Sequence, residues 1–290
     1  MKYGNRPIGI FDLTNECPLR CKHCYYYTNV SRLPRELDDH VFLTRLKKTR
    51  DQYNIRSAFW IGGEPLVKPE LLRRALEFFP RNAVATSGAV SIPTDLDAGL
   101  LVSIDGPEEA HDALRGEGAF ATAMANIAPL RPRSFALATT ITAATVDYIG
   151  ALPELVTATR AQGVLVGFHV GRPDDPSRVD DERRDEAVDQ LLEIHRAHPG
   201  AMLQTREAIE LLRPRHSARL AKKCIYRDTA IAFDVRLGVK RPCTFAGNAD
   251  CDACGCPIVA THAAWRGDDV ESGVLLHVLF PKRQALASGA

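Results

Sequence analysis

Residues 11–27 read FDLTNECPLRCKHCYYY and hold three closely spaced cysteines, Cys17, Cys21 and Cys24. Three thiolates at this spacing can bind three irons of a 4Fe–4S cluster and leave the fourth iron without a protein ligand. A small molecule can chelate that open iron. The alternative is a zinc site, which needs four ligands and would take His23 as the fourth. His23 lies inside the short loop between Cys21 and Cys24, which makes ligation by all four awkward.

The composition is that of a chain that can bury a full core. It has 290 residues, 45% hydrophobic, with a net charge of +1, and this near-neutral charge gives no case for binding nucleic acid. No apolar stretch approaches the roughly 20 residues that cross a membrane, and the first residues have no hydrophobic signal core. We therefore expect a cytoplasmic protein, without a membrane partner, whose eight cysteines bind metal rather than form disulfides.

Strand-like apolar runs alternate with amphipathic stretches along the first two thirds of the chain. The runs that we assign as strands are residues 8–13, 55–61, 83–85, 100–104, 135–141 and 164–170. The stretches with helical spacing are residues 37–53, 69–79, 120–130, 146–162 and 180–195. This βα alternation predicts a parallel sheet with helices outside, and six units are too few for a closed eight-stranded barrel. A turn-rich loop at residues 171–177 follows the sixth strand.

A second group of cysteines begins at Cys224. The residues between Cys224 and Cys243 read as a hairpin, with IAFDV, a turn at RLG and then VKRPC, which would bring these two cysteines together. Cys251 and Cys254 form another close pair, so four thiolates are available for a second 4Fe–4S cluster or for zinc. Cys256 is a fifth, which either replaces Cys254 as a ligand or stays free.

Polar and glycine-rich motifs stand at the ends of the predicted strands, where ligands bind in parallel barrels. The second strand runs into Gly62-Gly63-Glu64-Pro65, and two glycines let the backbone approach a ligand closely. The third ends at Thr86-Ser87-Gly88, and the fourth at Ser103-Ile104-Asp105-Gly106-Pro107, followed by His111 and Arg115. Asp105 either contacts a ligand or caps the next helix, and we expect His111 and Arg115 to order the loop. Thr139, Thr140 and His169 are weaker candidates on the fifth and sixth strands.

The three-cysteine segment, GGEP and SIDGP, in this order, resemble the radical S-adenosylmethionine (SAM) superfamily. The resemblance implies an α/β fold, namely an open partial (β/α)6 barrel like part of a TIM barrel. It also implies an enzyme that reductively cleaves SAM to a 5′-deoxyadenosyl radical. It implies that SAM binds the open iron and is contacted by Gly62, Gly63, Glu64 and Pro65. By the same analogy Ser103 and Asp105 reach the ribose, Ser87 lines the site, and Tyr25 lies near the adenine.

The C-terminal cysteines resemble the SPASM/twitch subdomain found behind such barrels, in its shorter form with one auxiliary 4Fe–4S cluster. This places the barrel at residues 1–200, the cysteine-rich subdomain at 201–260 and a tail at 261–290. The metal ligands would be Cys17, Cys21 and Cys24 for the first cluster, and four of Cys224, Cys243, Cys251, Cys254 and Cys256 for the second.

The expected reaction is hydrogen-atom abstraction, with the auxiliary cluster taking the leftover electron. The chain begins almost at its first strand, without an N-terminal peptide-recognition domain, which favours a small-molecule substrate such as an amino sugar or specialised metabolite. A peptide maturase is the alternative, and a non-catalytic iron–sulfur or zinc protein is the rival of another class. A reducing partner such as flavodoxin or ferredoxin would supply the first electron.

Overall fold

The structure is a computed structural model that describes residues 6–28, 33–132, 134–267, 269 and 281. No helix within these residues is long and apolar enough to cross a membrane.

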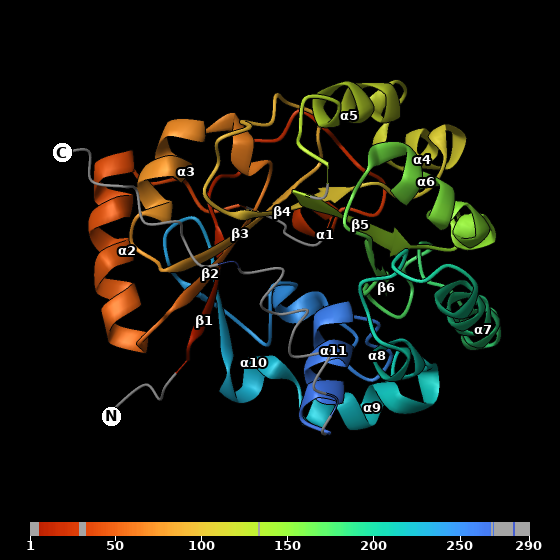
Figure 1. Cartoon of the computed structure of the whole chain (residues 1–290). Helices are drawn as coiled ribbons and strands as arrows, with labels where there is room; N and C mark the ends of the chain where they lie inside the picture. The colour runs from red at the N-terminus through yellow and green to blue at the C-terminus, as the bar shows by residue number, and fades with distance from the viewer. Residues whose placement is uncertain (1–5, 29–32, 133, 268, 270–280, 282–290) are drawn as a thin grey trace.

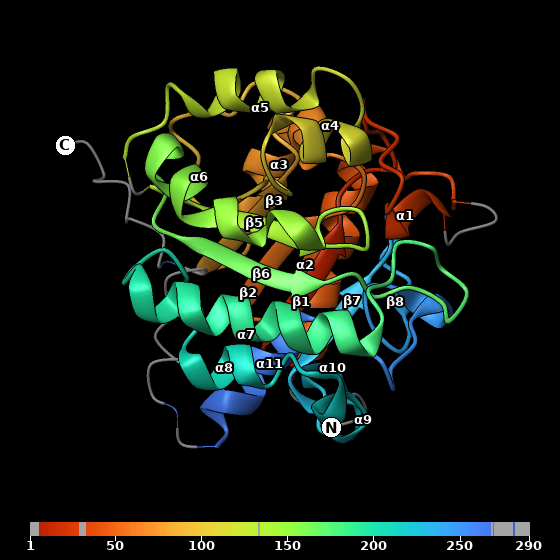
Figure 2. The ribbon, with the colours of Figure 1, turned by 90° about the vertical axis from the view of Figure 1, so that its right-hand side faces the viewer.

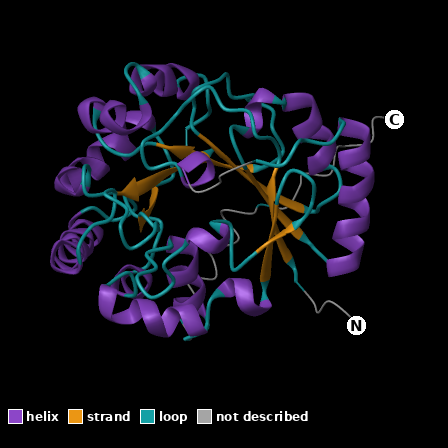
Figure 3. Cartoon of the chain, turned by 180° about the vertical axis from the view of Figure 1, so that it is seen from behind, coloured by secondary structure: helices purple, strands orange, loops and turns teal. Residues whose placement is uncertain are grey.

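Six parallel strands form the inner wall of an open barrel, and helices form its outer layer (Figure 3). The strands are β1 (Ile8–Asp12), β2 (Ser57–Ile61), β3 (Arg81–Thr86), β4 (Gly99–Ser103), β5 (Phe135–Ile141) and β6 (Val164–Phe168). They lie side by side in chain order, and every neighbouring pair is parallel. The α/β fold with a parallel sheet predicted from the apolar runs is therefore confirmed, and all six strands fall where the sequence places them.

The helices that cover the barrel follow the spacing of its apolar residues. In α2 (Asp39–Tyr53) the buried residues Phe42, Leu43, Leu46 and Thr49 recur every three or four positions, which turns one face to the sheet. The other outer helices are α3 (Pro69–Leu76), α4 (Glu108–Arg115), α5 (Ala119–Ile127), α6 (Leu152–Thr159) and α7 (Asp181–Ala197). Short helical turns complete this part of the chain: α1 (Tyr25–Thr28), η1 (Pro65–Val67) and η2 (Val146–Ala151).

The C-terminal region is mainly helical and gathers under one side of the barrel (Figure 1). It comprises α8 (Arg206–Glu210), α9 (Pro214–Lys222), α10 (Ile225–Asp228), β7 (Ala230–Phe233), β8 (Val239–Lys240), η3 (Ala246–Asn248) and α11 (Pro257–Trp265). The predicted hairpin exists as β7 and β8, but β7 also pairs in parallel with β1, with Ala230 opposite Ile8. The hairpin therefore extends the barrel sheet. Part of the expected tail, residues 261–265, belongs to α11, whereas its last six residues lie outside the described part of the chain.

One aromatic stack joins the hairpin to the barrel core. The ring centroids of Phe11 in β1 and Phe233 in β7 are 5.1 Å apart, and those of Phe11 and Trp60 are also 5.1 Å apart. All three side chains are fully buried. Stacked aromatic pairs contribute about 0.5–1.5 kcal/mol each beyond the burial of their area, so the C-terminal hairpin and the barrel share one core.

Candidate functional site

The three-cysteine loop leaves β1 at the carboxyl end of the sheet and is tied there by backbone hydrogen bonds. Leu13 N donates to Ile61 O at 2.8 Å, and Gly63 N donates to Thr14 O at 2.8 Å. Glu64 N donates to Glu16 O at 2.7 Å. The loop therefore lies directly against the end of β2, and the GGEP segment holds it in place.

The two glycines of this segment permit that close approach. A Cβ atom at Gly63 would lie 2.1 Å from Glu16 O, and one at Gly62 would lie 2.7 Å from Thr14 O. Gly62 also has a φ of 123°, a conformation that side chains rarely adopt. The sequence predicted that these glycines admit a ligand, and the structure adds a second role, which is to admit the backbone of the cysteine loop.

A cavity of about 330 Å³ opens at these strand ends, and Cys17, Cys21 and Cys24 all line it. Among the predicted SAM-site residues, Tyr25, Gly62, Gly63, Ser87 and Ser103 line it as well. Thr86, Thr139, Thr140 and His169 also belong to the polar part of the wall. We call this space the first cavity.

Glu64 and Pro65 lie outside the wall of the first cavity. Pro65 begins η1 and is buried, and Glu64 is 1% exposed. The Glu64 carboxylate accepts from Leu66 N at 3.1 Å, from Ser87 N at 2.7 Å and from Ser87 Oγ at 2.6 Å. In this arrangement Glu64 joins the loop after β2 to the loop after β3 and so positions Ser87. A direct contact from Glu64 to SAM stays a prediction.

Asp105 is a buried carboxylate at the centre of a polar network beside the first cavity. Its carboxylate accepts from Arg115 Nε at 2.6 Å and from Thr140 N at 3.0 Å, and it lies 3.5 Å from His23 Nε2. Burial raises the pKa of Asp105, but Arg115, His23 and these hydrogen bonds outweigh it and bring the pKa to about 2. Asp105 is therefore ionised at neutral pH, where it binds Arg115 and the backbone of Thr140.

The alternative role of Asp105 as a helix cap is wrong. The residue before α4 is Pro107, and no side chain caps that helix. His111 and Arg115 order the loop, as expected: Asp105 N donates to His111 Nδ1 at 3.2 Å, and Arg115 binds the Asp105 carboxylate. The helix α4 itself was not predicted, and its Leu114 O accepts from Lys22 N of the cysteine loop at 2.8 Å.

His169 occupies the first-cavity wall just after β6. Its Nε2 lies 2.8 Å from Asp175 Oδ2, and its ring is 6.3 Å from that of His23. The sequence left open whether His169 faces the substrate or is a satisfied histidine. It lines the cavity and has a carboxylate partner, so it is a satisfied histidine, and a contact with substrate stays a prediction.

The three thiols on the wall of the first cavity are the ones that the sequence predicts as ligands of an iron–sulfur cluster. Zinc needs its ligands around one ion, and within the described ranges no three His, Cys, Asp or Glu side chains are grouped in that way. His23 instead turns its Nε2 towards Asp105. In a cube each thiolate bonds a different iron, so Cys17, Cys21 and Cys24 need not converge on one point. Leu19 N donates to Cys17 Sγ at 3.4 Å, a contact that suits a thiolate ligand.

All five C-terminal cysteines line a second cavity, of about 530 Å³. Within the described part of the chain, its charged lining side chains are Arg6, Arg227 and Arg241, with no carboxylate among them. Burial raises the pKa of Cys243, Cys254 and Cys256 to about 12, so these thiols stay protonated at neutral pH unless a metal binds them. The hairpin does bring Cys224 and Cys243 to the wall of one cavity, which they share with the three arginines.

Cys256 lies on the wall of both cavities. It precedes α11, and the segment around it packs against the end of β6, where Phe168 N donates to Gly255 O at 3.0 Å. A Cβ atom at Gly167 would lie 2.3 Å from Pro257 Cδ, so the glycine in β6 is what lets this segment approach. In Figure 2, α7 lies below β6, and α8 and α11 lie next to each other below α7.

Arg184 is a buried residue beside the second cysteine group, and nothing in the sequence indicates its position. It lies in α7, is 3% exposed, and donates to Leu212 O at 2.7 Å, Ala253 O at 2.9 Å and Cys254 O at 3.0 Å. Its guanidinium also lies 4.9 Å from the ring centre of Phe168. Arg184 thereby clamps the second cysteine loop onto β6. In a strongly charged helix an arginine gives no sequence signal that it is buried.

Comparison with known proteins gives two kinds of match. Residues 11–145 match the sequence model of the Radical SAM superfamily. Pre-heme d1 synthase of Dinoroseobacter shibae is 28% identical over 173 residues, 55% of this chain and 42% of that protein. PqqA peptide cyclase of Methylorubrum extorquens is 29% identical over 103 residues, 34% of this chain and 27% of that protein. The matched parts thus span less than half the length of these curated relatives.

Solved structures share the fold. The enzyme anSMEcpe with bound AdoMet superposes with a TM-score of 0.64 at 17% identity, over 82% of this chain and 75% of that chain. SuiB of Streptococcus suis, bound to the precursor peptide SuiA, superposes with a TM-score of 0.61 at 11% identity, over 94% of this chain and 67% of that chain. The parallel partial barrel and the three-cysteine loop at its strand ends thus accompany a match of residues 11–145, just under half of this chain, to the sequence model of the Radical SAM superfamily.

Proposed function

We propose that this protein cleaves SAM reductively in the first cavity and abstracts a hydrogen atom from a substrate bound there. One observation carries the proposal: Cys17, Cys21 and Cys24 line the same cavity as the strand-end residues Ser87 and Ser103. When bound, a 4Fe–4S cluster supplies the electron for cleavage and SAM supplies the radical that takes the hydrogen atom. The chain's own residues hold and orient these groups.

The residues that would hold SAM are those that reach the first cavity. Gly62 and Gly63 present backbone there, and Ser87 and Ser103 present hydroxyls that can bind polar groups of SAM. Tyr25 contributes an aromatic face, and its ring packs on Phe245 of the C-terminal region with centroids 4.7 Å apart. The cavity therefore offers cysteines to the cluster, hydrogen-bonding groups to the polar parts of SAM and an aromatic face to its adenine.

We propose a second 4Fe–4S cluster in the second cavity, held by four of its five cysteines. Support comes from the shared lining, from the three arginines and from the absence of a carboxylate among the described lining residues. Cys256, on the wall between the cavities, would bring this site next to the substrate. The second cluster would accept the electron left on the substrate after hydrogen abstraction, which makes the reaction an oxidation.

Two classes of substrate are candidates, a small molecule and a peptide. Sequence analysis favoured a small molecule, whereas PqqA peptide cyclase is named for a peptide and SuiB is bound to its precursor peptide. These relatives support a peptide at least as well. A short precursor gene beside this gene, with a product that loses two hydrogens on treatment with the enzyme, would decide for a peptide. Unchanged peptide, and turnover of an amino sugar, would decide against it.

The test of the proposed reaction is formation of 5′-deoxyadenosine under anaerobic, reducing conditions. We expect the parent protein to form it and the variant with Cys17, Cys21 and Cys24 changed to alanine to form none. Cys251→Ala is the matched control, because it removes a thiol from the second cavity only, and it should retain SAM cleavage. Continued cleavage by the triple variant would refute the assignment of the first cavity.

A further inference from the structure

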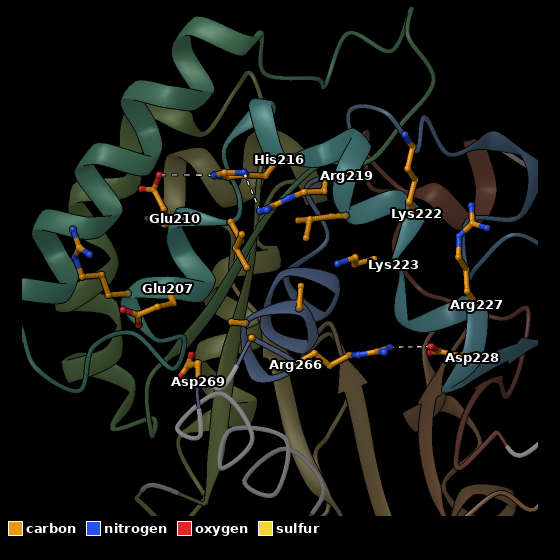
Figure 4. A pocket seen from close by; sticks show the side chains of 16 residues that line it. Glu207, Glu210, His216, Arg219, Lys222, Lys223, Arg227, Asp228, Arg266 and Asp269 are labelled. Carbon is orange, nitrogen blue, oxygen red and sulfur yellow. Dashed lines mark hydrogen bonds and ion pairs between the residues drawn. The ribbon is translucent and has the colours of Figure 1, made fainter.

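A third cavity, of about 720 Å³, lies outside the barrel among α8, α9, α10 and α11 (Figure 4). Its floor is apolar and includes Leu211, Leu220, Ala263 and Ala264. It shares no lining residue with the first cavity, where SAM is proposed to bind. A ligand in the third cavity would therefore contact none of the residues that line the proposed SAM site.

The carboxylates of the third cavity are mostly engaged. Glu210 accepts from Arg213 Nε at 3.0 Å and also from Arg215. Asp228 pairs with Arg266 at 2.9 Å, as the dashed line in Figure 4 shows. These arginines balance the charge of Glu210 and Asp228. The other two lining carboxylates, Glu207 and Asp269, lie on the side of the cavity away from Lys222, Lys223 and Arg227 in Figure 4, and Asp269 accepts from Thr205 Oγ1 at 2.6 Å.

The cations on the α9–α10 side have no such balance. Arg219, Lys222, Lys223 and Arg227 are all exposed, and none forms an ion pair within the described ranges. Figure 4 shows these four side chains along the α9 and α10 side of the cavity. We call these four residues the cationic surface. Four uncompensated positive charges beside an apolar floor complement an acidic protein, and their field would speed its association.

The cationic surface continues directly into the second cavity. Arg227 lines both cavities, and Lys223 is followed in the chain by Cys224. Cys251, on the wall of the second cavity, is itself exposed. A protein bound to the cationic surface would therefore sit beside the cysteines of the second cavity. Electron transfer weakens steeply with distance, so this is a favourable place for a protein that exchanges electrons with that site.

We propose that the cationic surface docks an acidic one-electron carrier protein that takes the electron leaving through the second cavity. The proposal rests on the proposed second cluster. After hydrogen abstraction the substrate radical loses one electron and one proton. The proton goes to solvent, and the same electron reduces the carrier by one step, which restores the oxidised state of the second site. An acidic peptide substrate is disfavoured at this surface, because the third cavity has no wall in common with the first.

The binding test compares two variants of the reconstituted protein with equal changes of charge. Arg219→Glu/Lys222→Glu reverses two cations of the surface, and Lys47→Glu/Lys48→Glu reverses two exposed cations on α2, far from it in Figure 1. The probe is an oxidised acidic flavodoxin, titrated by calorimetry at 50 and 300 mM salt. We expect affinity to fall at least tenfold in the first variant and less than twofold in the second, and the parent to bind more weakly at high salt.

A kinetic test isolates the second site. With Cys17, Cys21 and Cys24 changed to alanine, only the second cluster remains to be reduced by dithionite, and its oxidation by flavodoxin is followed in a stopped-flow instrument. Addition of Arg219→Glu/Lys222→Glu should slow this oxidation at least tenfold and leave oxidation by a small neutral quinone unchanged. Iron content separates the two proposals: a protein without a second cluster refutes the proposed function, whatever flavodoxin binding shows.

Three results would overturn the docking proposal. They are flavodoxin binding that does not depend on salt, equal loss of affinity in both charge-reversal variants, and tighter binding of a short DNA duplex than of flavodoxin at this surface.

Discussion

Arg184 offers the sharpest test of how the second cysteine site is built. Arg184→Met keeps a long apolar side chain beside Phe168 and removes the guanidinium. That guanidinium donates to the carbonyls of Leu212, Ala253 and Cys254 at 2.7, 2.9 and 3.0 Å. The substitution leaves these carbonyls without their donor and releases the segment that carries Cys254 and Cys256.

The cost can be estimated from these contacts. Each hydrogen bond from a charged donor is worth about 1.5–3 kcal/mol, but burial of the cation opposes folding and lowers its pKa to about 10. We therefore expect a net loss of about 2–4 kcal/mol, below the sum of the three bonds. At about 2 cal/mol/K of unfolding entropy per residue, a chain of this length should lose about 3–7 °C in Tm.

The assay is iron content after anaerobic reconstitution, together with 5′-deoxyadenosine formation. Arg184→Met should lose about four irons per chain, the content of one cube, and retain SAM cleavage. Arg183→Met is the matched control, because Arg183 is only half-buried and pairs with the exposed Asp147, a contact worth about 0–1 kcal/mol. A full iron content in Arg184→Met, or equal loss in both variants, would refute the clamp.

Three other predictions concern single contacts. Gly167→Ala should displace Pro257 and slow substrate turnover more than tenfold with SAM cleavage intact; substrate turnover at the parent rate would count against it. Glu64→Ala should weaken SAM affinity about tenfold with iron content intact, because Ser87 loses its acceptor; unchanged affinity in a binding titration would show that Ser87 needs no such support. Asp105→Asn should destabilise the metal-free protein by about 2–3 kcal/mol at pH 7. The folded-state pKa of Asp105 is about 2, so its stabilisation is present above about pH 4 and should disappear as the pH falls towards 2. If urea unfolding shows the same difference between the parent and Asp105→Asn at neutral pH and near pH 2, the prediction is wrong.

The barrel was predictable because each strand carries its own local signal. Runs such as residues 135–141 are apolar and bounded by turns, and alternation with amphipathic stretches defines a parallel sheet. The pairing of β7 with β1 had no such signal, because it joins segments more than 200 residues apart. Helix α4 was missed because only eight residues with mixed charges form it.

The residues of the candidate site also fall into those with a local signal in the sequence and those without one. The cysteines, glycines and strand-end hydroxyls were found because their chemistry is unusual at those positions. Other features of the site depend on which loops meet in space. These are the hydrogen-bond partners of Glu64, the position of Asp105 away from the start of α4, and the contacts of Arg184 with the second cysteine loop. Single residues such as Glu64 carry no sign of whether a ligand or a neighbouring loop takes their hydrogen bonds. The position of Cys256 on the walls of both cavities was likewise visible only in the three-dimensional structure.

The most direct test of the account is an iron count with Mössbauer spectroscopy on the parent and on Cys224→Ala/Cys243→Ala. If the first and second cavities each hold a cluster, the parent should contain about eight irons in two cubes. The variant should hold about four and still form 5′-deoxyadenosine. A parent with a single cube and zinc in the second cavity would contradict the account, as would loss of SAM cleavage in the variant.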